Sequence, residues 1–126
     1  MQASLCRVIV FCADVKKLTG FYEKYLGLTI VGDLSEDWAV LKSGNFELAF
    51  HRIGEEYRKS SPENFTADTN TKFVFEITGS IEDLREKLLE NKIEVGELRT
   101  FSGMSDVVCD GKDPEGNVFQ LKLIHR

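Results

Sequence analysis

The hydrophobic pattern in the first half of the chain changes from a strand period to a helix period and back. Residues 6–12 are mostly β-branched or aromatic and predict a strand. From Val15, apolar residues recur at three- and four-residue spacing, which predicts a helix with Asp14 as its N-cap and Gly27 as a left-handed C-cap. Gly44-Asn45 predicts a tight turn between two later strands. Three such strands are expected, at 29–33, 38–42 and 46–52.

The second half repeats this order. A strand is expected at 72–78, and Ser80 with Asp83 resembles a capping box that opens a second helix. The segment 113–117, Asp-Pro-Glu-Gly-Asn, predicts a turn before the last strand. The polar segment 54–71 separates the halves as a linker. Strands are expected after the helix at 93–100, 106–109 and 118–124.

The near-repeat indicates an α+β fold built from a duplicated strand–helix–strands unit. A chain of 126 residues fits one domain, with module 1 at about 5–53, the linker at about 54–71 and module 2 at about 72–126. A ligand pocket is therefore expected within the domain or at an oligomer interface.

Strand parity separates an apolar face from a mixed polar face, because alternate side chains point to opposite sides of a sheet. Four matching strand positions carry polar residues on the mixed face, namely Arg7, Glu47, Lys72 and Gln120. Two units that each present two polar side chains in this way suggest a shared cleft between them. Aromatic residues, Trp38 and Phe11, are candidates for its apolar lining, and ordinary packing at a dimer interface is the alternative for them. His51, on the same face, is a candidate acid or base, or simply a polar group near a strand end.

Composition excludes several function classes. A formal net charge of −5 without a basic run argues against a nucleic-acid surface. No apolar leader or membrane span is evident, so we expect a cytoplasmic protein without membrane or nucleic-acid partners. Three cysteines, Cys6, Cys12 and Cys109, lack the spacing of a zinc knuckle and are expected to be buried small residues.

Two motifs resemble a known superfamily. The first is Asp14 with Phe21-Tyr22 and Leu26-Gly27-Leu28, and the second is the run Asp-Pro-Glu-Gly-Asn-Val-Phe-Gln-Leu at 113–121. In this order, and within paired units, they resemble the vicinal-oxygen-chelate superfamily of glyoxalase I, extradiol dioxygenases, fosfomycin-resistance transferases and bleomycin-binding proteins. The resemblance implies two βαβββ modules that form a curved, mostly antiparallel eight-stranded sheet around a concave cleft, often completed across a homodimer.

The resemblance also implies where a metal would bind, and this chain departs from that pattern. Metal-dependent members take His, Gln or Glu ligands from the first and fourth strands of each module. The first-strand positions here are Arg7 and Lys72, which present only donors and positive charge. The fourth-strand positions are Glu47 and Gln120, and Glu47 alone is a good ligand. No cofactor is therefore predicted.

The leading hypothesis is a metal-free, homodimeric small-molecule-binding protein whose cleft suits an anionic or aromatic ligand. Arg7 and Lys72 would hold the anion, and Glu47 and Gln120 would orient it. One alternative is a metal-dependent lyase or dioxygenase resembling glyoxalase I, with nickel, zinc, manganese or iron on Glu47 and with His51 or Gln120 as further ligands. The other is a non-catalytic relic scaffold in which Arg7, Glu47 and Lys72 form an ion-pair plug.

Overall fold

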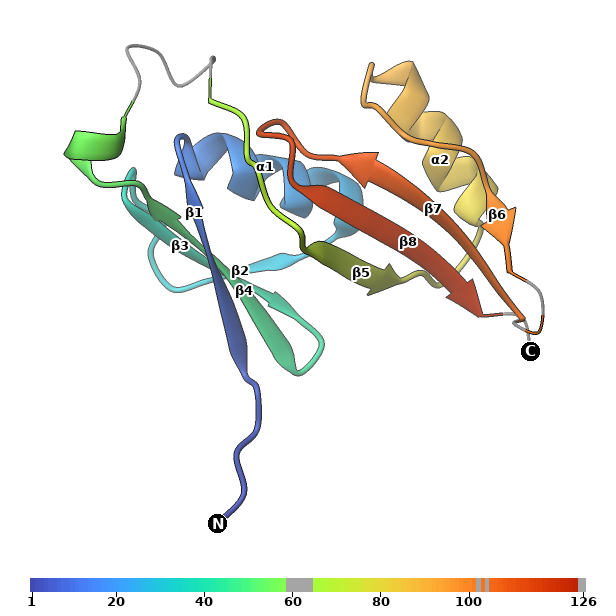
Figure 1. The fold of residues 1–126 in the computed structure, drawn as a ribbon, viewed down its shortest axis with the longest axis horizontal. Coiled ribbons are helices and arrows are strands. Elements are labelled where there is room, and N and C mark those ends of the chain that lie inside the picture. The colour runs from blue at the N-terminus through green and yellow to red at the C-terminus, as the bar shows by residue number, and fades with distance from the viewer. Residues whose placement is uncertain (59–64, 102, 104, 125–126) are drawn as a thin grey trace. The chain divides into compact units, whose positions relative to one another are not determined.

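The computed structural model describes residues 1–58, 65–101, 103 and 105–124. The chain divides into two compact units, Met1–Thr66 and Ala67–Arg126. The described part of each unit contains one α-helix and one four-stranded sheet (Figure 1). In each sheet one strand pairing is parallel and two are antiparallel. The predicted α+β fold of two strand–helix–strands modules is confirmed.

The first unit forms a sheet with the strand order β1-β4-β3-β2. A short 3₁₀ helix, Glu55–Tyr57, follows β4, the last strand of this unit in chain order. Of the predicted linker, residues 59–64 lie outside the described residues. The elements of this sheet and its helix are β1 (Arg7–Cys12), α1 (Val15–Leu26), β2 (Thr29–Val31), β3 (Trp38–Ser43) and β4 (Phe46–Arg52).

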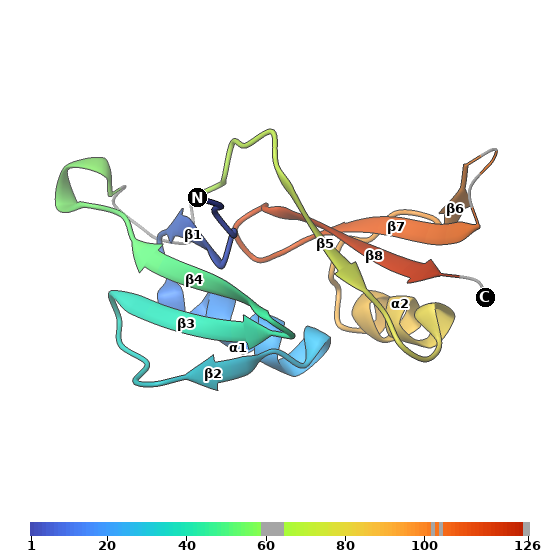
Figure 2. The ribbon, with the colours of Figure 1, turned by 90° about the horizontal axis from the view of Figure 1, so that it is seen from below.

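Local chemistry defines the ends of α1 as predicted. The Asp14 carboxylate accepts a hydrogen bond from the Lys17 N–H at 3.1 Å, and Gly27 adopts a left-handed φ of 69°. The helix lies on one face of the first sheet (Figure 2), where Tyr22 stacks on Phe50 at a centroid distance of 5.6 Å. The core of this unit therefore lies between α1 and the apolar face of its sheet.

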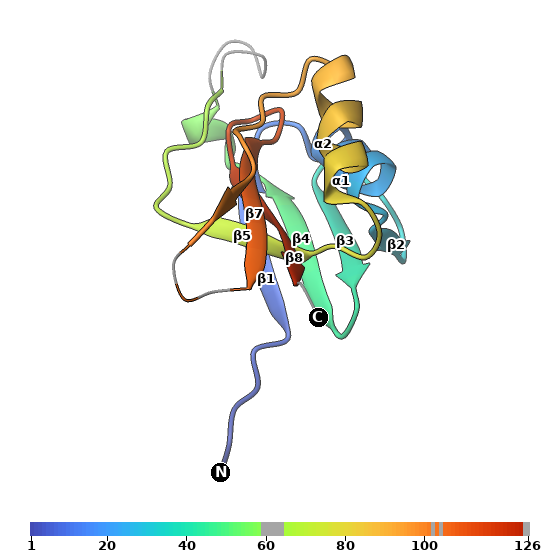
Figure 3. The ribbon, with the colours of Figure 1, turned by 90° about the vertical axis from the view of Figure 1, so that its right-hand side faces the viewer.

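The second unit forms a sheet with the order β5-β8-β7-β6. Its helix has Ser80 as the N-cap, whose hydroxyl accepts a hydrogen bond from the Asp83 N–H at 3.1 Å. That helix lies on one side of the sheet (Figure 3). The elements are β5 (Lys72–Glu76), α2 (Ile81–Glu90), β6 (Arg99–Thr100), β7 (Asp106–Lys112) and β8 (Val118–Ile124).

The segment after α2 differs most from its prediction. The expected strand at 93–100 is wrong, because only Arg99–Thr100 forms a ladder and Val95 makes an isolated bridge to Gly111. Arg99 lies opposite Val108. From Val95 to Arg99 there are four residue steps, whereas from Gly111 to Val108 on β7 there are three. One extra residue on one side interrupts a ladder in the manner of a β-bulge. The strand expected at 106–109 in turn continues to Lys112.

Two other expectations can be compared with the structure. Cys12 and Cys109 are buried as predicted, whereas Cys6 is exposed because it precedes β1 and lies outside the core. Burial raises the pKa of the Cys109 thiol, and this outweighs the opposing effect of Arg85.

Among the described residues, no helix is both long enough and apolar enough to cross a membrane.

Candidate functional site

Strand register brings the predicted polar and aromatic residues of the first unit to one face of its sheet. In this register Arg7 lies opposite Glu47, and His51 lies between Phe11 and Trp38. Exposure alternates along β1, as the sequence parity predicts. The face opposite α1 therefore carries an ion pair and an aromatic cluster, which we define as Phe11, Trp38 and His51.

The ion pair lies close to this aromatic cluster. Arg7 donates hydrogen bonds from Nε at 3.1 Å and from Nη2 at 2.9 Å, both to Oε1 of Glu47. The guanidinium carbon of Arg7 also lies 5.7 Å from the centroid of the Trp38 ring, within cation–π range. On β4, fully buried Ala49 lies between Glu47, the partner of Arg7, and His51, the partner of Trp38. Its small side chain leaves room for the contact between Arg7 and Trp38. Arg7 is thus oriented by both a carboxylate and an aromatic ring.

The aromatic cluster presents an apolar surface to solvent. The ring of His51 meets Phe11 edge-on at 5.3 Å and meets Trp38 edge-on at 5.8 Å. Phe11 remains 62% exposed although it is a large apolar side chain. The structure thus places the predicted residues Phe11, Trp38 and His51 together. A catalytic role for His51 stays a prediction.

In the second unit, the predicted residues Lys72 and Gln120 meet at a residue that the sequence did not single out. Asp110 Oδ2 accepts from Lys72 Nζ at 2.7 Å and from Arg99 Nη2 at 3.4 Å. Its other oxygen, Oδ1, accepts from Gln120 Nε2 at 3.0 Å. We call these four residues the Asp110 cluster.

Sequence parity could have found Asp110 had the strand been extended. The prediction ended at residue 109, but Asp110 lies directly opposite Gln120 in the β7–β8 ladder. The predicted equivalence of the Arg7–Glu47 and Lys72–Gln120 positions is also imperfect. In the second unit Gln120 lies opposite Val74, and Lys72 lies opposite Val118. The carboxylate that meets Lys72 is therefore Asp110, while Glu47 is bonded to Arg7.

The environment of Asp110 stabilises its charged form. Partial burial alone would raise the pKa of this carboxyl group. Hydrogen bonds from Lys72 and Gln120, with the positive charges of Lys72 and Arg99, outweigh burial, and the pKa is lowered from its ordinary value. Asp110 is therefore an ionised acceptor at neutral pH.

This shift predicts an acid-dependent loss of stability that Asp110→Asn should remove. Because the folded pKa lies below the unfolded value, the unfolded state binds more protons in the interval between them. The stabilisation by the carboxylate should be complete above about pH 4 and lost as the pH falls through the folded pKa. Urea unfolding of both proteins at several pH values measures this. A difference in unfolding free energy that stays constant on acidification would contradict the prediction.

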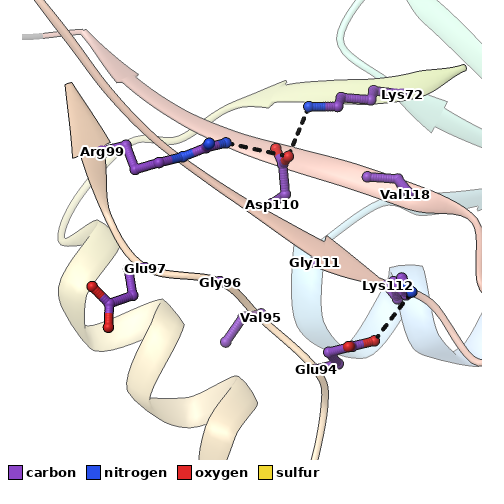
Figure 4. A pocket seen from close by; sticks show the side chains of 10 residues that line it. All are labelled: Lys72, Glu94, Val95, Gly96, Glu97, Arg99, Asp110, Gly111, Lys112 and Val118. Carbon is purple, nitrogen blue, oxygen red and sulfur yellow. Dashed lines mark hydrogen bonds and ion pairs between the residues drawn. The ribbon is translucent and has the colours of Figure 1, made fainter. Parts of the chain in front are cut away.

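A cavity of about 640 Å³ lies beside the Asp110 cluster (Figure 4). Its walls come from β7, from the starts of β5 and β8 and from the segment 94–97. Charged side chains of both signs line it, including Lys72, Arg99 and Asp110. We call it the second-unit cavity.

The residues at the expected metal positions do not fit a divalent cation. Glu47 bonds to Arg7, and the amide nitrogen of Gln120 is directed at Asp110. Asp110 itself is bonded to two cations, which would repel a metal ion. Among the described residues, no group of three or more His, Cys, Asp or Glu side chains is placed to hold a metal. Two of the four positions are cations without lone pairs, and the Glu47 carboxylate already accepts from Arg7.

Comparisons with known proteins give a family and a set of similar folds. The model of the Glyoxalase/Bleomycin resistance protein/Dioxygenase superfamily matches residues 4–121. A search of curated proteins found no match.

Three solved structures illustrate the similarity of fold. An integron cassette protein from the mobile metagenome of V. cholerae is 20% identical, with a TM-score of 0.73 over 99% of this chain and 98% of that one. Lactoylglutathione lyase from Agrobacterium tumefaciens is 16% identical, with a TM-score of 0.73 over 97% of this chain and 94% of that one. A fosfomycin resistance protein from Listeria monocytogenes is 13% identical, with a TM-score of 0.76 over 99% and 96%. At these identities the similarity shows the fold alone.

Proposed function

This chain belongs to the Glyoxalase/Bleomycin resistance protein/Dioxygenase superfamily, and we propose that it is a metal-independent member that binds a small, flat, anionic molecule. Two of the structural neighbours have names that refer to small molecules, lactoylglutathione and fosfomycin. Because a fold hosts many activities, the proposal depends on the side chains of the site.

The observation that carries the proposal is the aromatic cluster beside Arg7. An exposed Phe11 and a half-buried Trp38 each make a T-shaped ring contact with His51 on the face of the sheet opposite α1. Small-molecule sites combine apolar and aromatic walls with a few polar anchors. A flat ring system would cover Phe11 and Trp38 and remove their apolar surface from water.

Arg7 supplies the polar anchor for the anionic group. Its guanidinium has five N–H donors, and Glu47 accepts from two of its nitrogens. The remaining donors can bind a carboxylate or phosphate while Glu47 and the Trp38 ring hold the side chain in place. Glu47 therefore acts in orienting Arg7.

The competing function is a scaffold in which the Arg7–Glu47 ion pair simply closes the face. The hydrogen bond of 2.9 Å favours it, because a well-made pair can be self-sufficient. The side chains of Arg7 and Glu47 are 38% and 28% exposed, so the pair still borders solvent and is accessible to a ligand. A cleft shared by the two units, ligand contacts from Lys72 and Gln120, and a homodimer stay predictions.

The test is a fluorescence titration with 2-naphthoate, a flat aromatic carboxylate. Trp38 is the only tryptophan of the chain, so its emission reports binding at this face. Arg7→Gln should weaken binding about ten-fold or more, because it removes a charge-assisted hydrogen bond. The matched control is Arg52→Gln. It also removes one positive charge, but from the last residue of β4, where the ion-pair partner is Asp37. It should change the affinity less than about two-fold.

Either of two results would count against this proposal. Absence of any change in Trp38 emission would indicate that the face does not bind such ligands and would favour the closed scaffold. Equal affinities for the parent protein and Arg7→Gln would show that Arg7 is not the anchor.

A further inference from the structure

The second-unit cavity has walls that are held in place by backbone hydrogen bonds. The Lys112 N–H donates to the Glu94 carbonyl at 3.0 Å, and the Gly96 N–H donates to the Asp110 carbonyl at 2.7 Å. From the helix side, Arg85 Nε donates to the Gly96 carbonyl at 2.8 Å. These hydrogen bonds fix the walls of the cavity, which lowers the entropic cost of ordering them around a bound molecule.

The ladder between this wall and β7 contains one extra residue. Between the Val95–Gly111 bridge and the Arg99–Val108 pair, four steps on one side oppose three on the other. A bulge disrupts the ladder locally and bends the bulged strand. The segment still bonds to β7 at Gly96, so the ladder is interrupted only between that contact and the Arg99–Val108 pair.

Positive charge is concentrated at one end of the cavity. Lys72 and Arg99 share the single carboxylate of Asp110, so these three groups carry a formal charge of +1. Their side chains are 47% and 51% exposed, and each cation has donors beyond the one that meets Asp110. Arg99 is further oriented by the Phe101 ring, 5.7 Å from its guanidinium carbon.

The negative charges elsewhere in the cavity do not cancel this end. Glu94 forms an ion pair with Lys112 at 3.6 Å. Figure 4 shows this pair apart from the Asp110 cluster, and shows the Glu97 carboxylate directed away from Asp110. An anion is therefore favoured between Lys72 and Arg99 rather than at the far end.

The middle of the cavity is apolar and lacks aromatic groups. Val95, Val118 and the two glycines Gly96 and Gly111 line it, and none of its lining side chains is aromatic. Such walls suit an alkyl chain better than a flat ring, for which stacking partners are needed.

We propose that the second-unit cavity is a binding site for a small aliphatic carboxylate, with the carboxylate between Lys72 and Arg99 and the alkyl chain against Val95 and Val118. Asp110 acts as a positioning residue that holds both cations at the mouth of the cavity. The site lies wholly within the second unit and does not depend on the function proposed for the first sheet.

The test uses butyrate as the probe and backbone amide NMR shifts of isotope-labelled protein as the readout. Butyrate should shift the amides of Gly96 and Gly111, whereas 1-butanol, which has the same chain without the charge, should not. The double substitution Lys72→Gln and Arg99→Gln should weaken butyrate binding about ten-fold or more. Arg99→Gln alone should weaken it less and, because Arg99 is exposed, should leave the fold intact.

Two control variants separate this site from general charge effects and from the first sheet. Lys17→Gln removes one positive charge from the exposed surface of α1, and Arg7→Gln alters the first-sheet site. Neither should change butyrate affinity by more than about two-fold. Absence of shifts at Gly96 and Gly111 with soluble butyrate would overturn the inference, as would equal shifts with 1-butanol. If butyrate instead acts only through Arg7, the cavity site is wrong while the first-sheet proposal stands.

Discussion

Gly111→Ala is expected to lower the free energy of unfolding by about 3 kcal/mol, near the upper end of typical overpacking effects. A Cβ at this position would overlap Cζ of Phe119 and lie 2.8 Å from its Cε2 and 3.0 Å from Cγ1 of Val95. Phe119 is fully buried, so its ring cannot turn into solvent to relieve the overlap. The alanine must therefore displace packed core atoms.

The matched control for this substitution is Gly96→Ala. The nearest atom to a Cβ at Gly96 is the Asp110 carbonyl oxygen at 3.7 Å, an ordinary contact. Its effect should fall within about 1 kcal/mol of zero, since alanine also reduces the entropy of the unfolded chain. Urea unfolding followed by circular dichroism compares the two. Equal stabilities for the two variants would contradict the packing argument.

A second variant tests the cause of the loss. Phe119→Leu shortens the side chain that meets Gly111 and should by itself destabilise the core. Combined with Gly111→Ala, its cost should be less than additive, because the added methyl group enters space that the ring has vacated. Simple additivity would show that the strain has another source.

Asp113→Ala is expected to lower the free energy of unfolding by about 3 kcal/mol or more. The Asp113 Oδ1 accepts from the N–H groups of Glu115 at 2.9 Å and Asn117 at 3.0 Å, and Oδ2 accepts from Asn117 Nδ2 at 2.8 Å. All three residues are at most 5% exposed, so water cannot replace the lost acceptor. The substitution leaves three buried donors without their partner.

Asp113→Asn and Asp68→Ala bracket this effect. The asparagine keeps one acceptor oxygen and should cost less than the alanine, while Asp68 is exposed and its loss should cost little. The turn at 113–117 also holds the segment before β5, since the Ala67 N–H donates to the Glu115 carbonyl at 2.6 Å. Chemical unfolding of the three variants gives the order of their free energies of unfolding. An Asp113→Ala protein as stable as Asp68→Ala would sink this account of the turn.

Several elements could be predicted because short-range chemistry specifies them. The N-cap Asp14 and the C-cap Gly27 bound α1 as expected, and Gly44, with a φ of 59°, lies in the turn between β3 and β4. The strands at 46–52 and 118–124 were predicted without error, and the ends of most other strands differ by one to three residues. These features depend on neighbouring residues and on alternation alone.

The aromatic cluster was also foreseeable in part. Alternation placed Phe11 and His51 on one face, and the antiparallel β3–β4 register put Trp38 beside His51. The Arg7–Glu47 pair follows from the same parity. The contact between Arg7 and Trp38 was not predicted, because it spans two strands and depends on the small size of Ala49.

The Asp110 cluster shows where prediction from the pattern failed. The predicted strand ended at residue 109, so Asp110 was left outside the sheet. In the folded chain Gly111 is required by close packing against Phe119, and β7 runs through it to Lys112. The strand predicted at 93–100 was also wrong, because only Arg99–Thr100 pairs with β7 in a ladder and Val95 makes an isolated bridge to Gly111.

The sequence by itself therefore determined the fold class, the helix ends, the principal turns and the side of the sheet on which each candidate side chain lies. Those properties depend on caps, left-handed glycines and a period of two, which act within a few residues. The tertiary structure alone decided that the carboxylate that meets Lys72 is Asp110, since this contact joins β5 to β7 across β8. Arg7 meets Glu47 from 40 residues away, and Lys72 meets Asp110 from 38 residues away. A shift of one residue in either sheet would turn the side chains of one strand to the opposite face and separate these partners.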